Sequence, residues 1–323
     1  MTDISQVSSL GKPVIAEVER AVVGKRDLLE MMMASVLAGG HILLEDFPGL
    51  GKTLVARSFA KVLGLEFKRI QFTPDLLPGD ITGGYIFNRT NNKFELRKGP
   101  IFANIVLADE INRASPKTQS ALLEAMQEGR VTVAGESYEL PRPFFVLATQ
   151  NPIELEGTYP LPEAQLDRFF YKINVPSPVE DDLVEIARRT TSANLPEVHV
   201  VADAAGLLQM QELVREVPVE ERVYRYAARI VGATHPDNAA ALGIIRRSLR
   251  VGVSPRGIQA LIMASKVEAL LAGRKAVSMD DIKKVAYPAL RHRLFLSYEA
   301  QAEGISPDTI LDDVLKSVQP PSA

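Results

Sequence analysis

Residues 41–53 read His-Ile-Leu-Leu-Glu-Asp-Phe-Pro-Gly-Leu-Gly-Lys-Thr, and this stretch decides the fold. Its first part, Ile42 to Leu44, is a short apolar run that predicts a strand, and Pro48 to Thr53 form a glycine-bearing turn. The apolar spacing from Leu54 to Leu63 predicts a helix directly after the turn. A strand, a glycine loop ending in Gly-Lys-Thr and a helix are together typical of a phosphate-binding loop.

The chemistry of phosphate binding needs these residue types at this spacing. Gly49 and Gly51 let backbone N–H groups turn toward a phosphate without Cβ collisions, and the positive end of the helix points at the same anion. Lys52 can reach the β and γ phosphates, and the Thr53 hydroxyl can join a magnesium shell. The strict pattern has glycine where Asp46 stands, and the alternative is a plain strand-to-helix turn with a surface lysine. The core residues in this context favour nucleoside triphosphate binding.

Length and composition indicate a globular chain of about two domains, since it has 323 residues. The 37 basic and 40 acidic residues give a net charge of −3, so there is no bulk field to hold a polyanion. The absence of cysteine excludes a disulfide frame, a thiol nucleophile and a cysteine-based metal site. The four histidines show no ligand spacing, so no metal beyond magnesium is expected. A polar N-terminus and the lack of a membrane-length apolar run predict a soluble, cytoplasmic protein without stable membrane insertion.

Two helices are expected before the phosphate loop, at 13–23 and 26–37. The residues between them, Val22 to Gly24, stand at a distance from the loop that could let them touch a nucleotide base. A simple helix junction is an equally open interpretation of the same residues.

A second acidic motif follows a buried strand. Ile105 to Leu107 are apolar without alternation, as expected for a parallel strand covered on both faces. Asp109 and Glu110 come at its carboxyl end, where open α/β sheets place their ligands. Asp109 would hold magnesium directly or through water, and Glu110 would orient the attacking water. The alternative is a solvated acidic strand end.

Further strands are expected at 67–71, 144–149 and 170–175, with a proline-rich loop at 72–80. Two β-hairpins are expected, one pairing 85–87 with 94–96 and the other pairing 131–133 with 138–140. Ser115-Pro116 predicts the start of a helix that Gly129 ends.

Three polar residues cannot be assigned by local chemistry alone. Asn151 could fix a water near a γ phosphate, although Asn-Pro by itself is only a turn signal. Arg168 stands beside Asp167, and such an arginine is usually part of a surface ion pair. Arg256 lies in the first turn of a helix opened by Ser254-Pro255, where a solvent-facing arginine is the simplest interpretation. The basic groups at 246–247, 250 and 291–293 are expected on interface or solvated faces.

The resulting fold class is α/β, with a parallel sheet sandwiched by helices in residues 1–178. Pro176 and Pro178 mark the boundary, and a smaller all-helical domain is expected over 179–323. Its helices are expected at 180–192, 206–217, 220–234, 255–271 and 279–287, with a last one from Pro307.

Taken together, these residues resemble an AAA+ P-loop NTPase, and more closely the MoxR family of AAA+ ATPases. The resemblance extends from Val22 to Leu294. It is most specific in the motifs Glu-Asp-Phe-Pro-Gly-Leu-Gly-Lys-Thr, Gln-Phe-Thr-Pro-Asp-Leu-Leu-Pro-Gly-Asp, Ala-Asp-Glu-Ile-Asn-Arg-Ala, Ala-Thr-Gln-Asn-Pro, Leu-Asp-Arg-Phe and Ser-Pro-Arg-Gly. An acidic pair at Glu45-Asp46 looks acceptable in this family.

The resemblance implies ATP and Mg²⁺ as cofactors and gives roles to single residues. Lys52 and Thr53 match the Walker A positions, and Asp109 and Glu110 match the Walker B pair. Asn151 matches the first sensor and Arg256 the second, while Arg168 matches an arginine finger supplied to a neighbouring subunit. The residues expected to line the nucleotide site are Val23, Gly24, Pro48, Gly49, Leu50, Gly51, Lys52, Thr53 and Leu54.

An arginine acting on a neighbour implies a homo-oligomer, and the family forms rings that are typically hexameric. The resemblance also implies chaperone-like remodelling of client proteins, often with a von Willebrand A domain, and hairpins that face the pore or the partner. The role of Arg113, near the subunit boundary, stays open. Alternatives are a magnesium-chelatase-like motor subunit, a nucleotide-gated scaffold with little hydrolysis and a nucleic-acid motor, which the acidic charge balance argues against.

Overall fold

The computed structural model describes residues 5–45, 49, 51–151, 157–192 and 196–321. Contacts between residues divide the chain into two compact units. The first, which we call the sheet unit, comprises Lys12–Leu161 and Ile173–Leu208; the second, the helical unit, comprises Met1–Gly11, Pro162–Lys172 and Gln209–Ala323. The division is therefore not a single cut along the chain.

A five-stranded sheet with the order β2-β5-β8-β1-β9 forms the centre of the fold. Its strands are β1 (Ile42–Glu45), β2 (Phe67–Gln71), β5 (Ile105–Asp109), β8 (Phe145–Gln150) and β9 (Tyr171–Asn174). The pairs β2–β5, β5–β8 and β8–β1 are parallel, and every one of the five strands lies where the sequence predicts one.

The apolar runs of the central strands explain this arrangement. All five residues of β5 and the first five of β8 are buried, which requires cover on both faces of the sheet. Helix α3 packs against β2 and β5. The larger helices with residues in this unit are α1 (Ser5–Glu19), α2 (Arg26–Ala38), α3 (Lys52–Val62), α5 (Pro116–Glu128), α7 (Glu180–Thr190) and α8 (Ala204–Glu216).

Local chemistry sets the ends of helix α5 as the sequence predicts. The Ser115 side chain accepts a hydrogen bond from the Thr118 N–H, and proline occupies the first turn. Gly129 ends the helix in a left-handed conformation with φ 65°, which glycine adopts without a Cβ collision.

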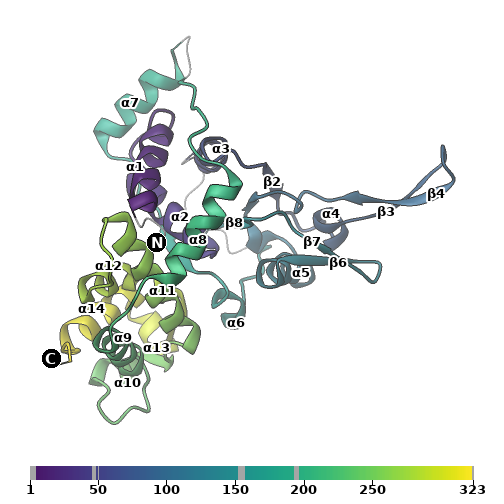
Figure 1. Ribbon diagram of the computed structural model, residues 1–323. Helices are drawn as coiled ribbons and strands as arrows, with labels where there is room; N and C mark the ends of the chain where they lie inside the picture. Colours follow the sequence, from purple (N-terminus) through teal and green to yellow (C-terminus); the bar gives the residue numbers. More distant parts are fainter. Residues whose placement is uncertain (1–4, 46–48, 50, 152–156, 193–195, 322–323) are drawn as a thin grey trace. The chain divides into compact units, whose positions relative to one another are not determined.

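Two antiparallel hairpins confirm the predicted inserts. One pairs β3 (Gly83–Asn88) with β4 (Lys93–Lys98), and the other pairs β6 (Arg130–Val133) with β7 (Glu136–Glu139). Figure 1 shows β3 and β4 extending away from the five-stranded sheet. The Tyr85 hydroxyl of β3 donates to Glu136 of β7 at 2.7 Å, so the two inserts are tied to each other.

A short helix, α4 (Pro78–Thr82), lies where the sequence predicts only a proline-rich loop. Pro78 occupies its first turn, and the Asp80 carboxylate accepts a hydrogen bond from the Leu77 N–H. The buried Ile81 and the packing of α4 against α5 hold this turn. A five-residue element has too little periodicity to be detected from sequence, because one turn shows no repeat.

The helical unit confirms a helical region after the sheet, and it adds three short helices, α6 (Glu163–Leu166), α10 (Gly243–Ser248) and α13 (Tyr298–Ala302), and a pair of short strands that the sequence does not predict. Its longer helices are α9 (Glu221–Ala233), α11 (Pro255–Leu271), α12 (Met279–Leu290) and α14 (Pro307–Ser317). A 3₁₀ turn follows α12 at Arg291–Arg293. The sheet unit contains a 3₁₀ turn of its own at Ile111–Arg113. A short antiparallel pair, β10 (Leu249–Val251) and β11 (Phe295–Leu296), accompanies them although only helices are expected. Strands of two and three residues show no alternation that sequence can reveal.

Among the described residues, no helix is long and apolar enough to cross a membrane.

Candidate nucleotide site

The phosphate loop leads from β1 directly into α3. Gly49 and Gly51 have φ of 91° and 76°, and a Cβ on either would meet no heavy atom within 4 Å, so their need for glycine is conformational. Gly51 is the N-cap of α3, and Lys52 and Thr53 are its first two residues. Both side chains are half-buried, at the helix end where N–H groups and the helix dipole favour an anion.

Not every predicted loop residue can be placed. Pro48 and Leu50, together with Asp46, lie outside the described residues. Leu54 is exposed on the first turn of α3, with 48% of its surface accessible.

Asp109 lies at the carboxyl end of β5 and is almost fully buried. Its Oδ1 accepts a hydrogen bond from the Thr149 hydroxyl at 2.7 Å, and its Oδ2 accepts from Arg69 at 2.6 Å. The carboxylate therefore already faces a positive charge on one oxygen.

Glu110, the next residue, is held by a different set of partners. Its Oε2 accepts from the Gln71 amide at 2.8 Å and from Arg113 at 3.0 Å. Its N–H donates to the Thr149 hydroxyl, and its backbone has φ 56° and ψ 50°. A left-handed conformation at a non-glycine residue is strained, and such strain clusters at functional sites. This conformation turns the backbone out of the direction of β5 directly after Asp109.

The sheet brings the two motifs and Asn151 to one edge. The register pairs Ala108 of β5 with Ala148 of β8, and Glu45 of β1 with Gln150 of β8. Since all three strands are parallel, Asp109, Asn151 and the residue that precedes the phosphate loop follow the same carboxyl edge. Asn151 is 8% exposed there. This is the edge at which open α/β sheets bind ligands.

A pocket of about 370 Å³ opens beside this edge. Gly24 and Lys25 line it from the turn between α1 and α2, and residues 173–176 line it from the end of β9. The Val175 N–H donates to the Glu45 carbonyl, so the pocket lies next to the strand that leads into the phosphate loop. Gly24 has φ 65°, and a Cβ there would come within 2.3 Å of the Asp182 carboxylate, so this position requires glycine. Val23 lies in the same turn.

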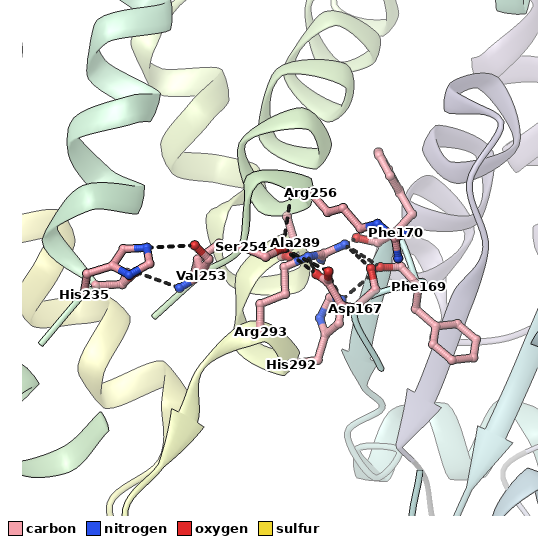
Figure 2. A network of polar contacts seen from close by, with 11 residues as sticks. Asp167, Phe169, Phe170, His235, Val253, Ser254, Arg256, Ala289, His292 and Arg293 are labelled. Carbon is pink, nitrogen blue, oxygen red and sulfur yellow. Dashed lines mark hydrogen bonds and ion pairs between the residues drawn. The ribbon is translucent and has the colours of Figure 1, made fainter. Parts of the chain in front are cut away.

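Arg168 and Arg256 both belong to the helical unit, and the backbone N–H of Arg256 joins a polar network around Asp167 (Figure 2). Ser254 caps α11 by accepting from the Arg256 N–H at 3.2 Å, and its hydroxyl donates to both carboxylate oxygens of Asp167. The Asp167 carboxylate also pairs with Arg293 at 2.9 Å. Arg168 is half-buried. Within the described part of the chain, Asp167 pairs with Arg293 rather than with its neighbour Arg168.

The expectation that residues 291–293 form a solvated or interface face is wrong for two of them. His292 and Arg293 are buried, with 4% and 3% of their surface accessible. Burial lowers the pKa of Arg293 to about 10 despite the opposing effect of Asp167, and burial also lowers the pKa of His292 well below its usual value. A basic run in sequence cannot reveal this, because the Asp167 carboxylate and the Phe169 carbonyl, which accept hydrogen bonds from Arg293, stand more than 120 residues earlier.

Comparisons with known proteins agree with this geometry. Residues 41–171 match the ATPase family associated with various cellular activities (AAA), and residues 242–314 match the AAA lid domain. Chaperone MoxR1 of Mycobacterium tuberculosis is 44% identical over 95% of this chain and 81% of its own length. The chain belongs to the MoxR family of AAA+ ATPases.

Two further relatives match along almost the whole chain. The uncharacterized protein YeaC of Bacillus subtilis is 47% identical over 97% of this chain and 95% of its own length. The crystal structure of a provisionally assigned ATPase from Cytophaga hutchinsonii has a TM-score of 0.93 at 42% identity, covering 98% of this chain and 96% of that one. As a MoxR-family ATPase, this chain binds and hydrolyses ATP.

The oxygen atoms at the sheet edge suit a small divalent cation. Thr53 offers a hydroxyl and Asp109 a carboxylate, and Mg²⁺ is held by one or two such groups together with phosphate and water. The described residues hold no cluster of three or more His, Asp or Glu side chains able to bind a metal. An arrangement with few protein ligands fits Mg²⁺ better than a metal that needs a complete protein cage.

Three residues near the MoxR Walker B pair were not anticipated from sequence. Arg69 and Gln71 reach Asp109 and Glu110 from neighbouring β2, and Thr149 reaches both from β8. Arg69 and Gln71 are two residues apart, so they share one face of their strand. The sequence signal that could have identified Arg69 and Gln71 is the pair of polar residues on one face at the carboxyl end of a predicted strand. The order of strands in the sheet, which makes β2 the neighbour of β5, was not available from sequence.

Proposed function

We propose that this chain is a ring-forming ATPase that uses Mg²⁺-dependent ATP hydrolysis to remodel or activate protein partners. The observation that carries the proposal is the shared sheet edge, at which the start of α3, the Walker B pair and Asn151 meet. Membership of the MoxR family supports the same function.

At this edge each side chain has a defined role in hydrolysis. Lys52 and the N–H groups of the loop stabilise charge on the transferring phosphoryl, and Asn151 helps to fix the water. Glu110 orients that water, and Arg113 and Gln71 hold its carboxylate. Thr53 and Asp109 would hold the Mg²⁺ ion, which would neutralise phosphate charge.

The pocket lined by Gly24 and the end of β9 suits the nucleotide base. Its volume of about 370 Å³ lies within the usual range of ligand pockets, and it adjoins the strand that enters the phosphate loop. We assign Val23 and Gly24 to this part of the site.

Arg168 acts on the ATP of a neighbouring subunit, and Arg256 senses the γ phosphate, so activity depends on assembly. An arginine finger contributes about 10³ to 10⁵ in rate. We propose a hexameric ring as the active form, in keeping with the family resemblance of the Leu-Asp-Arg-Phe motif.

The output of the cycle is work on a client protein. A relative of this chain bears the name chaperone. The hairpin β3–β4, which is tied to the other hairpin through Tyr85, presents two exposed aromatic side chains, Phe87 and Phe94. We propose that these hairpins contact the client, which carries a von Willebrand A domain. The alternative of a chelatase-like or nucleic-acid motor is not favoured, because MoxR relatives match along nearly the whole chain. The cytoplasmic location expected from sequence stays a prediction.

ATP turnover against protein concentration tests the proposal, with light scattering on each sample. Specific activity of the wild type should rise with concentration as subunits assemble. Glu110→Gln should assemble with ATP yet turn over at least about 10²-fold more slowly, and Arg168→Ala about 10³-fold more slowly.

A flat concentration dependence together with normal turnover by Arg168→Ala would show that each subunit works alone. Turnover that increases with DNA in a salt-sensitive way would instead favour a nucleic-acid motor. Slow wild-type turnover that Glu110→Gln leaves unchanged would favour a nucleotide-gated scaffold.

A further inference from the structure

A single buried guanidinium, that of Arg293, holds the backbone around Arg168. Its Nε donates to the Asp167 carboxylate at 2.9 Å, and its Nη2 donates to the Phe169 carbonyl at 2.7 Å and the Asp167 carbonyl at 3.2 Å. Its Nη1 donates to the carbonyls of Phe170 and Ala289. Figure 2 shows these donors converging on residues 167–170. The residues on either side of Arg168 are thus bound to one rigid group.

Neighbouring contacts reinforce this hold. His292 contacts the Phe169 carbonyl through Nε2 at 3.0 Å, and the Phe169 ring is fully buried. The depressed pKa of His292 keeps its imidazole neutral, so no second buried charge is added beside Arg293. The chain before and after Arg168 therefore has little freedom, whereas Arg168 itself is half-buried.

A gain in folding stability alone does not explain why the buried guanidinium of Arg293 is paired with Asp167. Replacing a buried ion pair with well-packed apolar side chains is often neutral or stabilising, because removing charges from water carries a large cost. What an apolar side chain cannot supply is five donors in a planar fork, which fix the directions of several carbonyls at once. The contacts of Arg293 therefore indicate that its role is to fix the backbone position of residues 167–170.

We propose that Arg293 is a positioning residue for Arg168, holding the backbone that carries it so that its guanidinium reaches the ATP of the next subunit. The inference rests on the proposed function, in which Arg168 acts on a neighbour. Arg256 is linked to Arg293 indirectly, because Ser254, which caps the helix that carries Arg256, donates to the Asp167 carboxylate that Arg293 also holds.

Arg293→Lys tests the proposal because it keeps the positive charge and removes the fork. We expect kcat to fall about 10²-fold, since misplacing a reacting group by ~1 Å costs about that much. The KM for ATP should stay within about twofold, because an arginine finger acts mainly in the transition state. Arg274→Lys is the matched control, since Arg274 also pairs with a buried aspartate, Asp281, in the same unit. Its turnover should match the wild type.

Mixed rings then show where Arg293 acts. A Glu110→Gln subunit has a defective site but an intact Arg168 and Arg293, so it can complete the site of an Arg293→Lys neighbour. An equal mixture of the two variants, assembled together, should recover up to about a quarter of wild-type turnover, because random assembly around a ring pairs them productively at that frequency. The same mixture made with Arg168→Ala instead of Arg293→Lys serves as the reference.

The outcomes distinguish the positioning role of Arg293 from the proposed action of Arg168 on a neighbouring subunit. Recovery in both mixtures supports the proposal. Recovery with Arg168→Ala but not with Arg293→Lys would overturn the positioning role of Arg293 and leave the proposed trans-acting finger intact. Wild-type turnover by Arg293→Lys alone would have the same meaning. Failure of both mixtures overturns the finger itself, and this inference falls with it.

A second variant covers the case in which Arg293→Lys does not fold or assemble, as judged by thermal unfolding and light scattering. Asp167→Asn removes the charge that faces Nε while keeping the size of the side chain. It should lower kcat less than Arg293→Lys and recover in the same mixture. Loss of activity without recovery would overturn the proposal.

Discussion

At the scale of single residues, His41 joins two parts of the sheet unit just before β1. Its Nε2 donates to the Met126 carbonyl at 2.9 Å, and its Nδ1 accepts from the Val146 N–H at 3.1 Å. Burial lowers the pKa of His41 to about 4, from an ordinary value of 6.5. The ring is thus neutral in the folded protein, and this tautomer satisfies both partners.

The depressed pKa gives a defined dependence of stability on pH. Between pH 6.5 and 4 the unfolded chain binds a proton at residue 41 and the folded chain does not, so the free energy of unfolding falls as pH falls. The contribution of His41 is complete above pH 6.5, and about 2 kcal/mol of it is lost by pH 5.

Urea unfolding at pH 7.5 and pH 5 measures this loss. His41→Gln keeps a donor and an acceptor but does not titrate, so its stability should drop about 2 kcal/mol less than that of the wild type over this range. An equal drop in both proteins would contradict the assignment of His41 as the titrating group.

At the scale of elements, the hairpin β3–β4 depends on two glycines at its base. A Cβ on Gly83 would lie 2.1 Å from the Arg97 carbonyl oxygen, and a Cβ on Gly99 would lie 2.2 Å from the Ile81 carbonyl oxygen. Backbone atoms cannot withdraw as the end of a side chain can. The close approach of α4, β3 and the chain after β4 therefore fixes how the hairpin leaves the sheet unit.

Gly99→Ala should loosen this base, while Gly84→Ala should not, because a Cβ on Gly84 meets nothing within 4 Å. We expect Gly99→Ala to cost about 1–3 kcal/mol locally, as overpacking does. Limited trypsin digestion should then cut at Arg89 and Lys93 several-fold faster than in the wild type. Equal cutting of Gly99→Ala and Gly84→Ala would show that the base tolerates the added carbon.

At the scale of the whole molecule, nucleotide binding should appear as added stability. A ligand that binds only the folded state at a hundred times its Kd adds about 2.7 kcal/mol. Glu110→Gln is the suitable protein, because slow hydrolysis keeps ATP intact during the measurement.

Thermal unfolding of Glu110→Gln with ATP tests this, with magnesium or with EDTA. Magnesium should give the larger rise in Tm, and EDTA should remove part of it. Adding Asp109→Asn should abolish the difference between the two conditions, since Asp109 is the proposed carboxylate ligand. A rise that is the same with EDTA would argue against metal-assisted ATP binding at this site.

The order of the helices and strands along the chain was largely predictable from the sequence. The five sheet strands, both hairpins and most helices follow from apolar runs and end signals, because these depend on residues close together in sequence. The domain boundary at residue 178 stays a prediction. Contacts group 162–172 with the helical unit and 173–208 with the sheet unit, and such grouping depends on packing partners that lie far away in the chain.

The sequence by itself determined the phosphate loop, the acidic strand end and the helix caps. Each of these is a local requirement of backbone conformation, as at Gly51, or of a short spacing, as in Asp109-Glu110. Only the tertiary structure decided that Arg69 faces Asp109 and that the buried Arg293 binds the backbone on either side of Arg168. Arg293 and Asp167 are 126 residues apart, and the order of strands and helices in space, rather than any local pattern, makes them partners.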